Sequence, residues 1–260
     1  MGLIRLGAAV SLAAIPLTLL HAQAAPDTLT ATQIALACAP PPSAEPPAAN
    51  AARILGAQDI DPRTLLGPQD LLVIGGGTQA GLQLGQTYFI RRAAGAYIGR
   101  PAAAYAYMGR AGRSTTVTAG WLRIVAVNET TSVAMVDYAC DAIFQNDYLE
   151  PFETPSVPRE ADRDDSTHEL DFTSLARVVA GQENRQTAAP GDYVVIDRGT
   201  DRGVAAGERL AIYRDLRVPG MPLAALGEAV VMSVGRNTAV IRIDRARDAV
   251  MTGDYLVPRK

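Results

Sequence analysis

The chain has 260 residues, with 24 Lys and Arg against 27 Asp and Glu, which gives a formal net charge of −3 at pH 7. This mildly negative balance, with Lys260 as the only lysine, gives no indication of a nucleic-acid-binding protein. The length suffices for one large core or two small ones, because domains commonly contain about 100–150 residues.

The N-terminus predicts export. Arg5 precedes an apolar run over residues 6–20, and the small residues Ala22 and Ala24 follow it. This is the pattern of a secretory signal peptide, which we place at residues 1–25. An uncleaved anchor is the alternative, although the run is shorter than the ~20 residues of a membrane-spanning helix. We therefore expect a periplasmic, secreted or outer-envelope protein with no transmembrane segment in the mature chain.

Residues 26–51 form an N-terminal segment that ends in a Pro/Ala-rich spacer, and within it residues 30–38 are compatible with a strand or a short helix. Cys38 and Cys140 are the only cysteines. An isolated pair in an oxidising compartment predicts a disulfide, with two free thiols as the alternative. A lipidated Cys38 is disfavoured, because Ala35 stands three positions upstream, where a lipobox has a larger aliphatic residue, and because the apolar run of residues 6–20 lies too far away.

The rest of the chain is an internal duplication. Residues 70–92 align without a gap over residues 192–214 with nine identities, and residues 120–151 align over 227–258 with twelve. Repeats of this kind indicate two copies of one structural unit. We therefore predict a first domain at 52–153, a polar linker at 154–170 and a second domain at 171–260.

Each copy contains five or six short β-rich runs separated by glycine turns, without a convincing helix of ten residues. Such spacing is typical of a small closed or nearly closed barrel. The predicted fold class is therefore all-β, with two tandem small β-barrel-like domains from an internal duplication. The copies differ most at residues 93–119, which are about twice as long as their counterpart at 215–226.

The glycines after the first strand of residues 71–85 resemble a dinucleotide-binding fingerprint, but the second copy does not support this interpretation. Residues 75–76 are both glycine, whereas the second copy has Asp197 and Arg198 there. A dinucleotide site also needs an acidic residue about 20 positions on, and residues 71–128 contain none. The shared positions therefore predict structural turns. They are Gly77, Gly81 and Gly85 in the first copy and Gly199, Gly203 and Gly207 in the second.

No catalytic, cofactor-binding or metal site is predicted. The mature chain has one histidine, His168, in the polar linker, where it is best interpreted as solvated. Asp162, Asp164 and Asp165 lack the spacing of a calcium loop. Two aspartates occupy equivalent positions in the two copies beside glycine or turn positions, where a carboxylate most often caps the local backbone. The pairs are Asp70 with Asp192 and Asp147 with Asp254.

The insertion at residues 93–118 is the predicted partner-binding site. It combines tyrosines with arginines, the types that dominate protein interfaces, and it contains no acidic residue. Arg91 and Arg92 precede it and belong to the same basic run. The bound molecule would be a partner protein or a glycan, and the alternative is a long, partly disordered hairpin insertion. The candidate contact residues are Tyr97, Arg100, Tyr105, Tyr107, Arg110 and Arg113.

The second copy resembles a family of small β-domains at the C-terminus of bacterial envelope proteins that carry LysM modules, and it is similar to the C-terminal domain of flagellar assembly protein T. The resemblance rests on residues 191–214 and 226–256, which follow a pattern of G-D-x-V-V, G-x-x-x-G-V-x-x-G, G-E and a final G-D. It implies a non-enzymatic module that supports binding or assembly in the envelope. The chain departs from these proteins in having no recognisable LysM segment.

We therefore expect an exported, non-enzymatic structural or binding component of the cell envelope. The expected partners are other envelope proteins or peptidoglycan, and self-association is left open. Two alternatives remain: an envelope hydrolase with an unrecognised carboxylate site, and a subunit of a flagellar or surface filament assembly.

Overall fold

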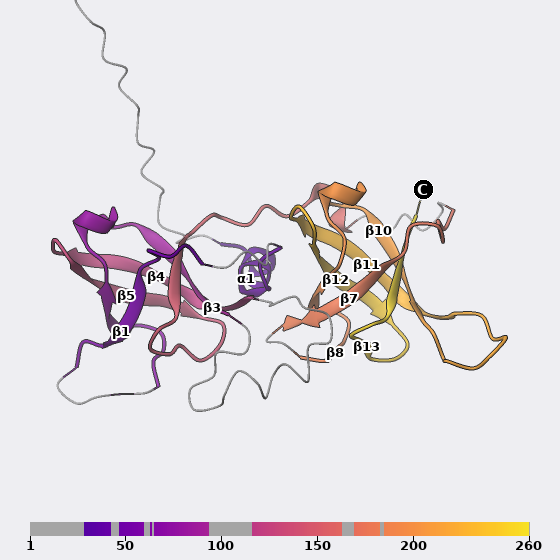
Figure 1. The fold of residues 1–260 in the computed structure, drawn as a ribbon, viewed down its shortest axis with the longest axis horizontal. Coiled ribbons are helices and arrows are strands. Elements are labelled where there is room, and N and C mark those ends of the chain that lie inside the picture. Colours follow the sequence, from indigo (N-terminus) through magenta and orange to yellow (C-terminus); the bar gives the residue numbers. More distant parts are fainter. Residues whose placement is uncertain are drawn as a thin grey trace, which may run out of the picture.

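The short strands of this chain bury their apolar faces by closing into two antiparallel barrels (Figure 1). The computed structural model describes residues 29–42, 47–59, 63, 65–93, 116–162, 169–182 and 185–259. Barrel 1 is built from β1 (Arg53–Ala57), β2 (Leu71–Gly75), β3 (Thr87–Ala93), β4 (Thr116–Val127), β5 (Thr131–Ala139) and β6 (Tyr148–Pro151). Barrel 2 is built from β7 (Ala176–Gly181), β9 (Tyr193–Ile196), β10 (Arg209–Arg214), β11 (Ala224–Val234), β12 (Ala239–Ala246) and β14 (Tyr255–Pro258).

The two barrels have the same topology. The strand order is β1-β2-β5-β4-β3-β6 in barrel 1 and β7-β9-β12-β11-β10-β14 in barrel 2, and both sheets close on themselves. The irregularity between Ile90 and Arg91 recurs between Ile212 and Tyr213. A β-bulge bends its strand and strengthens the local twist, so the duplication has kept the feature that helps the sheet to close. The predicted all-β, two-barrel fold is confirmed.

Short elements complete the fold. A small separate sheet pairs β8 (Thr187–Ala188) with β13 (Val250–Met251). One α-helix, α1 (Ala31–Cys38), precedes barrel 1, and the described 3₁₀ turns include η1 (Thr78–Ala80), η2 (Arg159–Asp162) and η4 (Thr200–Arg202). The strands of barrel 1 lie within residues 52–153 and those of barrel 2 within 171–260. The predicted signal peptide at residues 1–25 lies outside the described residues.

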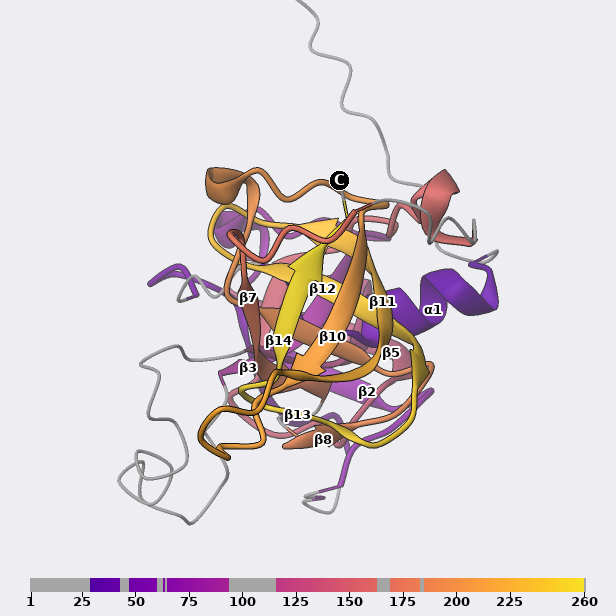
Figure 2. The ribbon, with the colours of Figure 1, turned by 90° about the vertical axis from the view of Figure 1, so that its right-hand side faces the viewer.

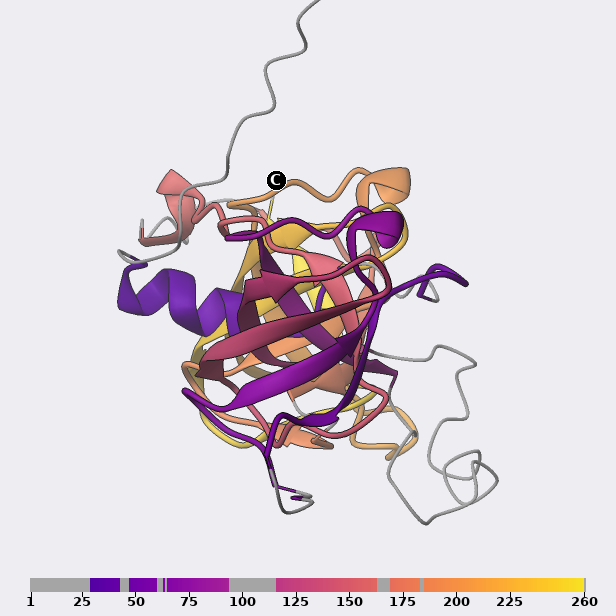
Figure 3. The same cartoon turned by 90° about the vertical axis from the view of Figure 1, so that its left-hand side faces the viewer.

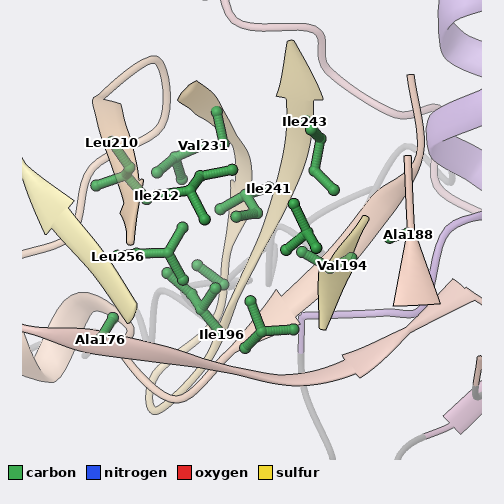
Figure 4. Close-up of a cluster of buried hydrophobic side chains, with 14 of the residues drawn as sticks. Ala176, Ala188, Val194, Ile196, Leu210, Ile212, Val231, Ile241, Ile243 and Leu256 are labelled. Atoms are coloured by element: carbon green, nitrogen blue, oxygen red, sulfur yellow. The ribbon is translucent and has the colours of Figure 1, made fainter. Parts of the chain in front are cut away.

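Aliphatic side chains fill each barrel. Ile212 and Ile241 are fully buried inside barrel 2, where the labelled side chains point toward one another (Figure 4). At two equivalent positions the two interiors exchange a large and a small side chain. Barrel 1 has the large Leu122 and the small Ala134, whereas barrel 2 has Ala229 and Ile241 at the corresponding positions. Exchanges that conserve volume are the ones that a close-packed core tolerates best.

The shared glycines meet two different requirements. Gly81 and Gly203 have φ of 82° and 79°, a left-handed conformation in which a Cβ atom is strained. Gly77 and Gly199 instead lie against another backbone, where an added Cβ would come within 2.2 Å of the Asn128 carbonyl oxygen and 2.4 Å of its counterpart. The residues after Gly77 form η1 and then β3, which leaves no room for the helix of a dinucleotide site.

Each barrel also carries apolar residues on its outer surface, and α1 lies between these two surfaces (Figure 1). Figure 3 views the molecule from the barrel 1 end and shows α1 beside that barrel. The outer residues of barrel 1 are Phe89, Trp121 and Phe152. Those of barrel 2 are Tyr193, Val195, Val230, Met232 and Val240.

Candidate functional site

The candidate site begins with α1, whose start is fixed by a capping box. The backbone N–H of Gln33 donates to Thr30 Oγ1 over 3.2 Å, and the N–H of Thr30 donates to Gln33 Oε1 over 2.9 Å. The helix ends at Cys38, two residues before Pro40. A helix of this length is marginal alone, so its stability must come from packing against other elements.

On one side α1 packs against barrel 1. Ala37 lies among Phe89, Trp121 and Phe152, with the ring centroids of Trp121 and Phe152 separated by 5.6 Å. Cys38 forms the predicted disulfide with Cys140, and their Cα atoms are 5.4 Å apart. The N-terminal segment is therefore attached to barrel 1 both by packing and by a covalent bond.

On its other side α1 packs against barrel 2. Leu36 and Ala39 join the outer apolar residues of β9, β11 and β12 in one buried cluster. The residues after the helix continue this bridge. Thr118 of barrel 1 donates to the Ala39 carbonyl oxygen over 2.9 Å, and Thr238 of barrel 2 donates to the Pro42 carbonyl oxygen. One short segment thus holds both barrels.

Part of the predicted polar linker at 154–170 also packs on barrel 2. Ala161 is fully buried, and its carbonyl oxygen accepts hydrogen bonds from Arg209 over 3.3 Å and from Arg242 over 3.0 Å. Val157 packs against the same apolar cluster as Leu36. Small apolar residues among the charged ones of this segment therefore cover part of barrel 2. His168 lies outside the described residues.

These elements enclose a cleft of about 740 Å³, which we call the interbarrel cleft. Its walls come from α1, the prolines that follow it, β3, the end of β6, the linker and the Met232 region of barrel 2. Four charged side chains line it: Arg91, Glu150, Glu153 and Glu160. Their balance is acidic.

Arg91 is the buried charge of this cleft, at 5 % exposure. Its Nε lies 3.2 Å from Glu150 Oε2, its guanidinium lies over the Phe89 ring at 4.1 Å, and it donates to Thr118. Burial lowers the pKa of Arg91, while the charge of Glu150 raises it. The sequence analysis grouped Arg91 with the predicted contact insertion, but its side chain is buried and held by residues of β3, β4 and β6.

Arg92 is likewise buried, in a network that links two strand ends. Its Nε lies 2.9 Å from Asp147 Oδ1, and the N–H of Phe144 donates to Asp147 Oδ2 over 3.0 Å. Burial raises the pKa of Asp147, and the hydrogen bond from Arg92 lowers it. In barrel 2, Arg214 and Asp254 form the same pair, with Arg214 Nε 2.8 Å from Asp254 Oδ1.

The Asp254 carboxylate also accepts from the N–H of Met251 over 2.7 Å, as Asp147 does from Phe144. The prediction that these two aspartates cap local turns is confirmed. Because both copies use the pair in the same way, the network belongs to the fold.

The predicted partner contacts at Tyr97, Arg100, Tyr105, Tyr107, Arg110 and Arg113 lie outside the described residues. Within the described part of the chain, no group of three or more His, Cys, Asp or Glu side chains could hold a metal ion. No described helix has the length and apolar character needed to cross a membrane. No model of a known protein family matches the sequence, and no curated protein is significantly similar to it.

Proposed function

We propose that the chain is an exported, non-enzymatic binding component of the bacterial cell envelope, and that it holds its partner in the interbarrel cleft. The observation that carries this proposal is the disulfide-attached helix α1, which joins two barrels around a cavity of about 740 Å³. Binding pockets commonly have volumes of about 300–1,000 Å³. The expected partners are other envelope proteins or peptidoglycan.

The disulfide supports export. Cys38 and Cys140 are bonded, and such bonds persist in oxidising compartments outside the cytosol. The pattern of residues 1–25 and the resemblance of the second copy to envelope β-domains favour the same location.

The chemistry of the charged residues supports binding over catalysis. Arg91 is paired with Glu150. The Arg92–Asp147 and Arg214–Asp254 pairs bind the backbone of turns in their own barrels. The remaining acidic residues at the cleft, Glu153 and Glu160, are exposed. This arrangement favours a partner that brings basic side chains to the cleft.

The test uses the purified oxidised protein with two substrates, isolated peptidoglycan sacculi and an extract of envelope proteins immobilised on beads. We expect retention on one of them without release of soluble fragments. The double variant Glu153→Lys/Glu160→Lys should lose retention by roughly tenfold, because it reverses the charge of the cleft rim. Glu129→Lys, at an exposed turn outside the cleft, is the matched control and should bind as the parent does.

Three results would count against the proposal. Release of soluble fragments from sacculi in proportion to the protein would favour the envelope hydrolase. Absence of retention on both substrates would refute a binding role. Equal loss in the Glu129→Lys control would show that retention follows the overall charge and does not depend on the cleft.

A further inference from the structure

Barrel 2 contains a surface at the position equivalent to the one by which barrel 1 contacts α1, and this surface is built from different residues. In barrel 1 this surface, the α1 seat, consists of aromatic residues on β3, β4 and β5, the aromatic residue after β6, and the cysteine after β5. Trp121 stacks on Tyr138 with ring centroids 4.6 Å apart, and it shares a buried cluster with Ala37 of α1. The α1 seat is Phe89, Trp121, Tyr138, Cys140 and Phe152.

The strand register identifies the equivalent positions in barrel 2. Gly120 pairs with Ile90 and Ala139, and Gly227 pairs in the same way with Ile212 and Ala246. The five seat positions therefore correspond to residues that are small or charged. They are Ala211, Glu228, Arg245, Arg247 and Arg259.

These replacements leave a groove of about 390 Å³ at this place, which we call the charged groove. Ala211 and Ala225 form part of its wall, and Ala211 stands where Phe89 fills the corresponding space in barrel 1. Figure 2 views the molecule from the barrel 2 end. It shows β10 and β14 facing outward, with α1 at the side of the molecule.

The groove is basic. Glu228 is held between two of its arginines, with Oε2 at 2.5 Å from Arg245 and Oε1 at 2.9 Å from Arg259. Both carboxylate oxygens are thus engaged by the groove's own cations. Arg247 is exposed, and within the described part of the chain its guanidinium has no hydrogen-bonding or ionic partner. Three cations and one anion line the groove.

We propose that the charged groove binds an acidic polypeptide segment of a partner protein. We infer a polypeptide ligand from barrel 1, where the equivalent strands hold a segment of chain through side-chain packing and a hydrogen bond to the Ala39 carbonyl oxygen. The acidic character follows from the arginines at three of the five seat positions, against the single acidic residue Glu228, since an excess of cations attracts carboxylates. The groove is separate from the interbarrel cleft.

Fluorescence anisotropy with fluorescein-labelled hexaglutamate and the oxidised full chain tests this proposal. We expect saturable binding that weakens as salt is added, and no binding of labelled hexalysine. Arg247→Glu should weaken hexaglutamate binding roughly tenfold or more. Arg202→Glu is the matched control, because Arg202 is also exposed but lies in η4, near the opposite end of β11.

A spectroscopic readout locates the site independently of affinity. In ¹⁵N-labelled protein, hexaglutamate should shift the amide signals of Gly227 and Ala246 on the groove wall. Absence of hexaglutamate binding at low salt overturns the proposal, and so does equal weakening by Arg202→Glu. Retention on sacculi that Arg247→Glu abolishes, with hexaglutamate binding unchanged, would assign the groove to a glycan instead.

The cleft variant Glu153→Lys/Glu160→Lys should keep hexaglutamate binding. Its behaviour therefore separates a failure at the charged groove from a failure at the interbarrel cleft.

Discussion

Removing the disulfide should lower the free energy of unfolding substantially, because the bond closes a very long loop. Cys38 and Cys140 are separated by 102 positions. The chain-entropy relation gives about 4.7 kcal/mol for a loop of about 100 residues, and native disulfides commonly contribute about 2–5 kcal/mol. We expect the Cys38→Ala/Cys140→Ala variant to lose about 3–5 kcal/mol, since no other covalent bond limits the unfolded chain.

Urea unfolding followed by tryptophan fluorescence measures this effect at the relevant place. Trp121 is the only tryptophan of the chain, and it is buried in the α1 seat at 4 % exposure. Reduced parent protein is the control and should unfold at the same urea concentration as the double variant. A loss below about 1 kcal/mol would refute the reasoning, because it would show that packing around Ala37 alone restrains the segment.

Two further predictions concern charged pairs. Asp147→Ala should destabilise the protein by about 3–5 kcal/mol, since it leaves the buried Arg92 charge without its main partner. Asp254→Ala should destabilise it less. Urea unfolding measures both changes, and a larger loss for Asp254→Ala than for Asp147→Ala would contradict the argument. Glu228 should titrate below its ordinary pKa of 4.5, mainly through its hydrogen bond from Arg245. Its stabilising contribution is then present above about pH 4.5 and lost as pH falls through the lowered pKa. NMR titration of the Glu228 carboxyl should show the midpoint rising in Arg245→Gln, and an unchanged midpoint would contradict this explanation.

The duplication made the fold predictable. Two copies with the same glycine spacing and the same short apolar runs specify one topology twice, and the barrels have equivalent strand orders. The position of the turn at Gly77 could also be predicted, but the reason why this turn needs glycine could not. Its φ of −141° is ordinary, and the requirement for glycine comes from the distant Asn128 carbonyl oxygen, which local sequence does not reveal.

The role of α1 could not be predicted from periodicity. Ile34 and Ala37 face barrel 1 whereas Leu36 faces barrel 2, so the helix is apolar in two directions and lacks the single stripe of a surface helix. The local signal for a helix at residues 30–38 is the capping box of Thr30 and Gln33, a pattern that a strand does not need.

The residues on the outer surfaces of the barrels indicate which surface is covered. The continuous apolar run of β9 is buried along its whole length, which is typical of a strand covered on both faces. A comparison of Trp121 with Glu228 and of Cys140 with Arg247, at equivalent positions, distinguishes the covered face of one barrel from the charged face of the other. Only the register identifies these positions as outward-facing.

The bridging position of α1 also constrains the order in which the chain can assemble. Cys38 and Cys140 both precede barrel 2, so the disulfide can form once barrel 1, whose last strand ends at Pro151, has folded. The contact of Leu36 with the Met232 cluster must form later, because Met232 lies far along the chain in β11 and contacts of large sequence separation form late. Barrel 1 with its attached helix α1 thus exposes an apolar surface at Leu36 and Ala39, and barrel 2 packs against that surface when it folds.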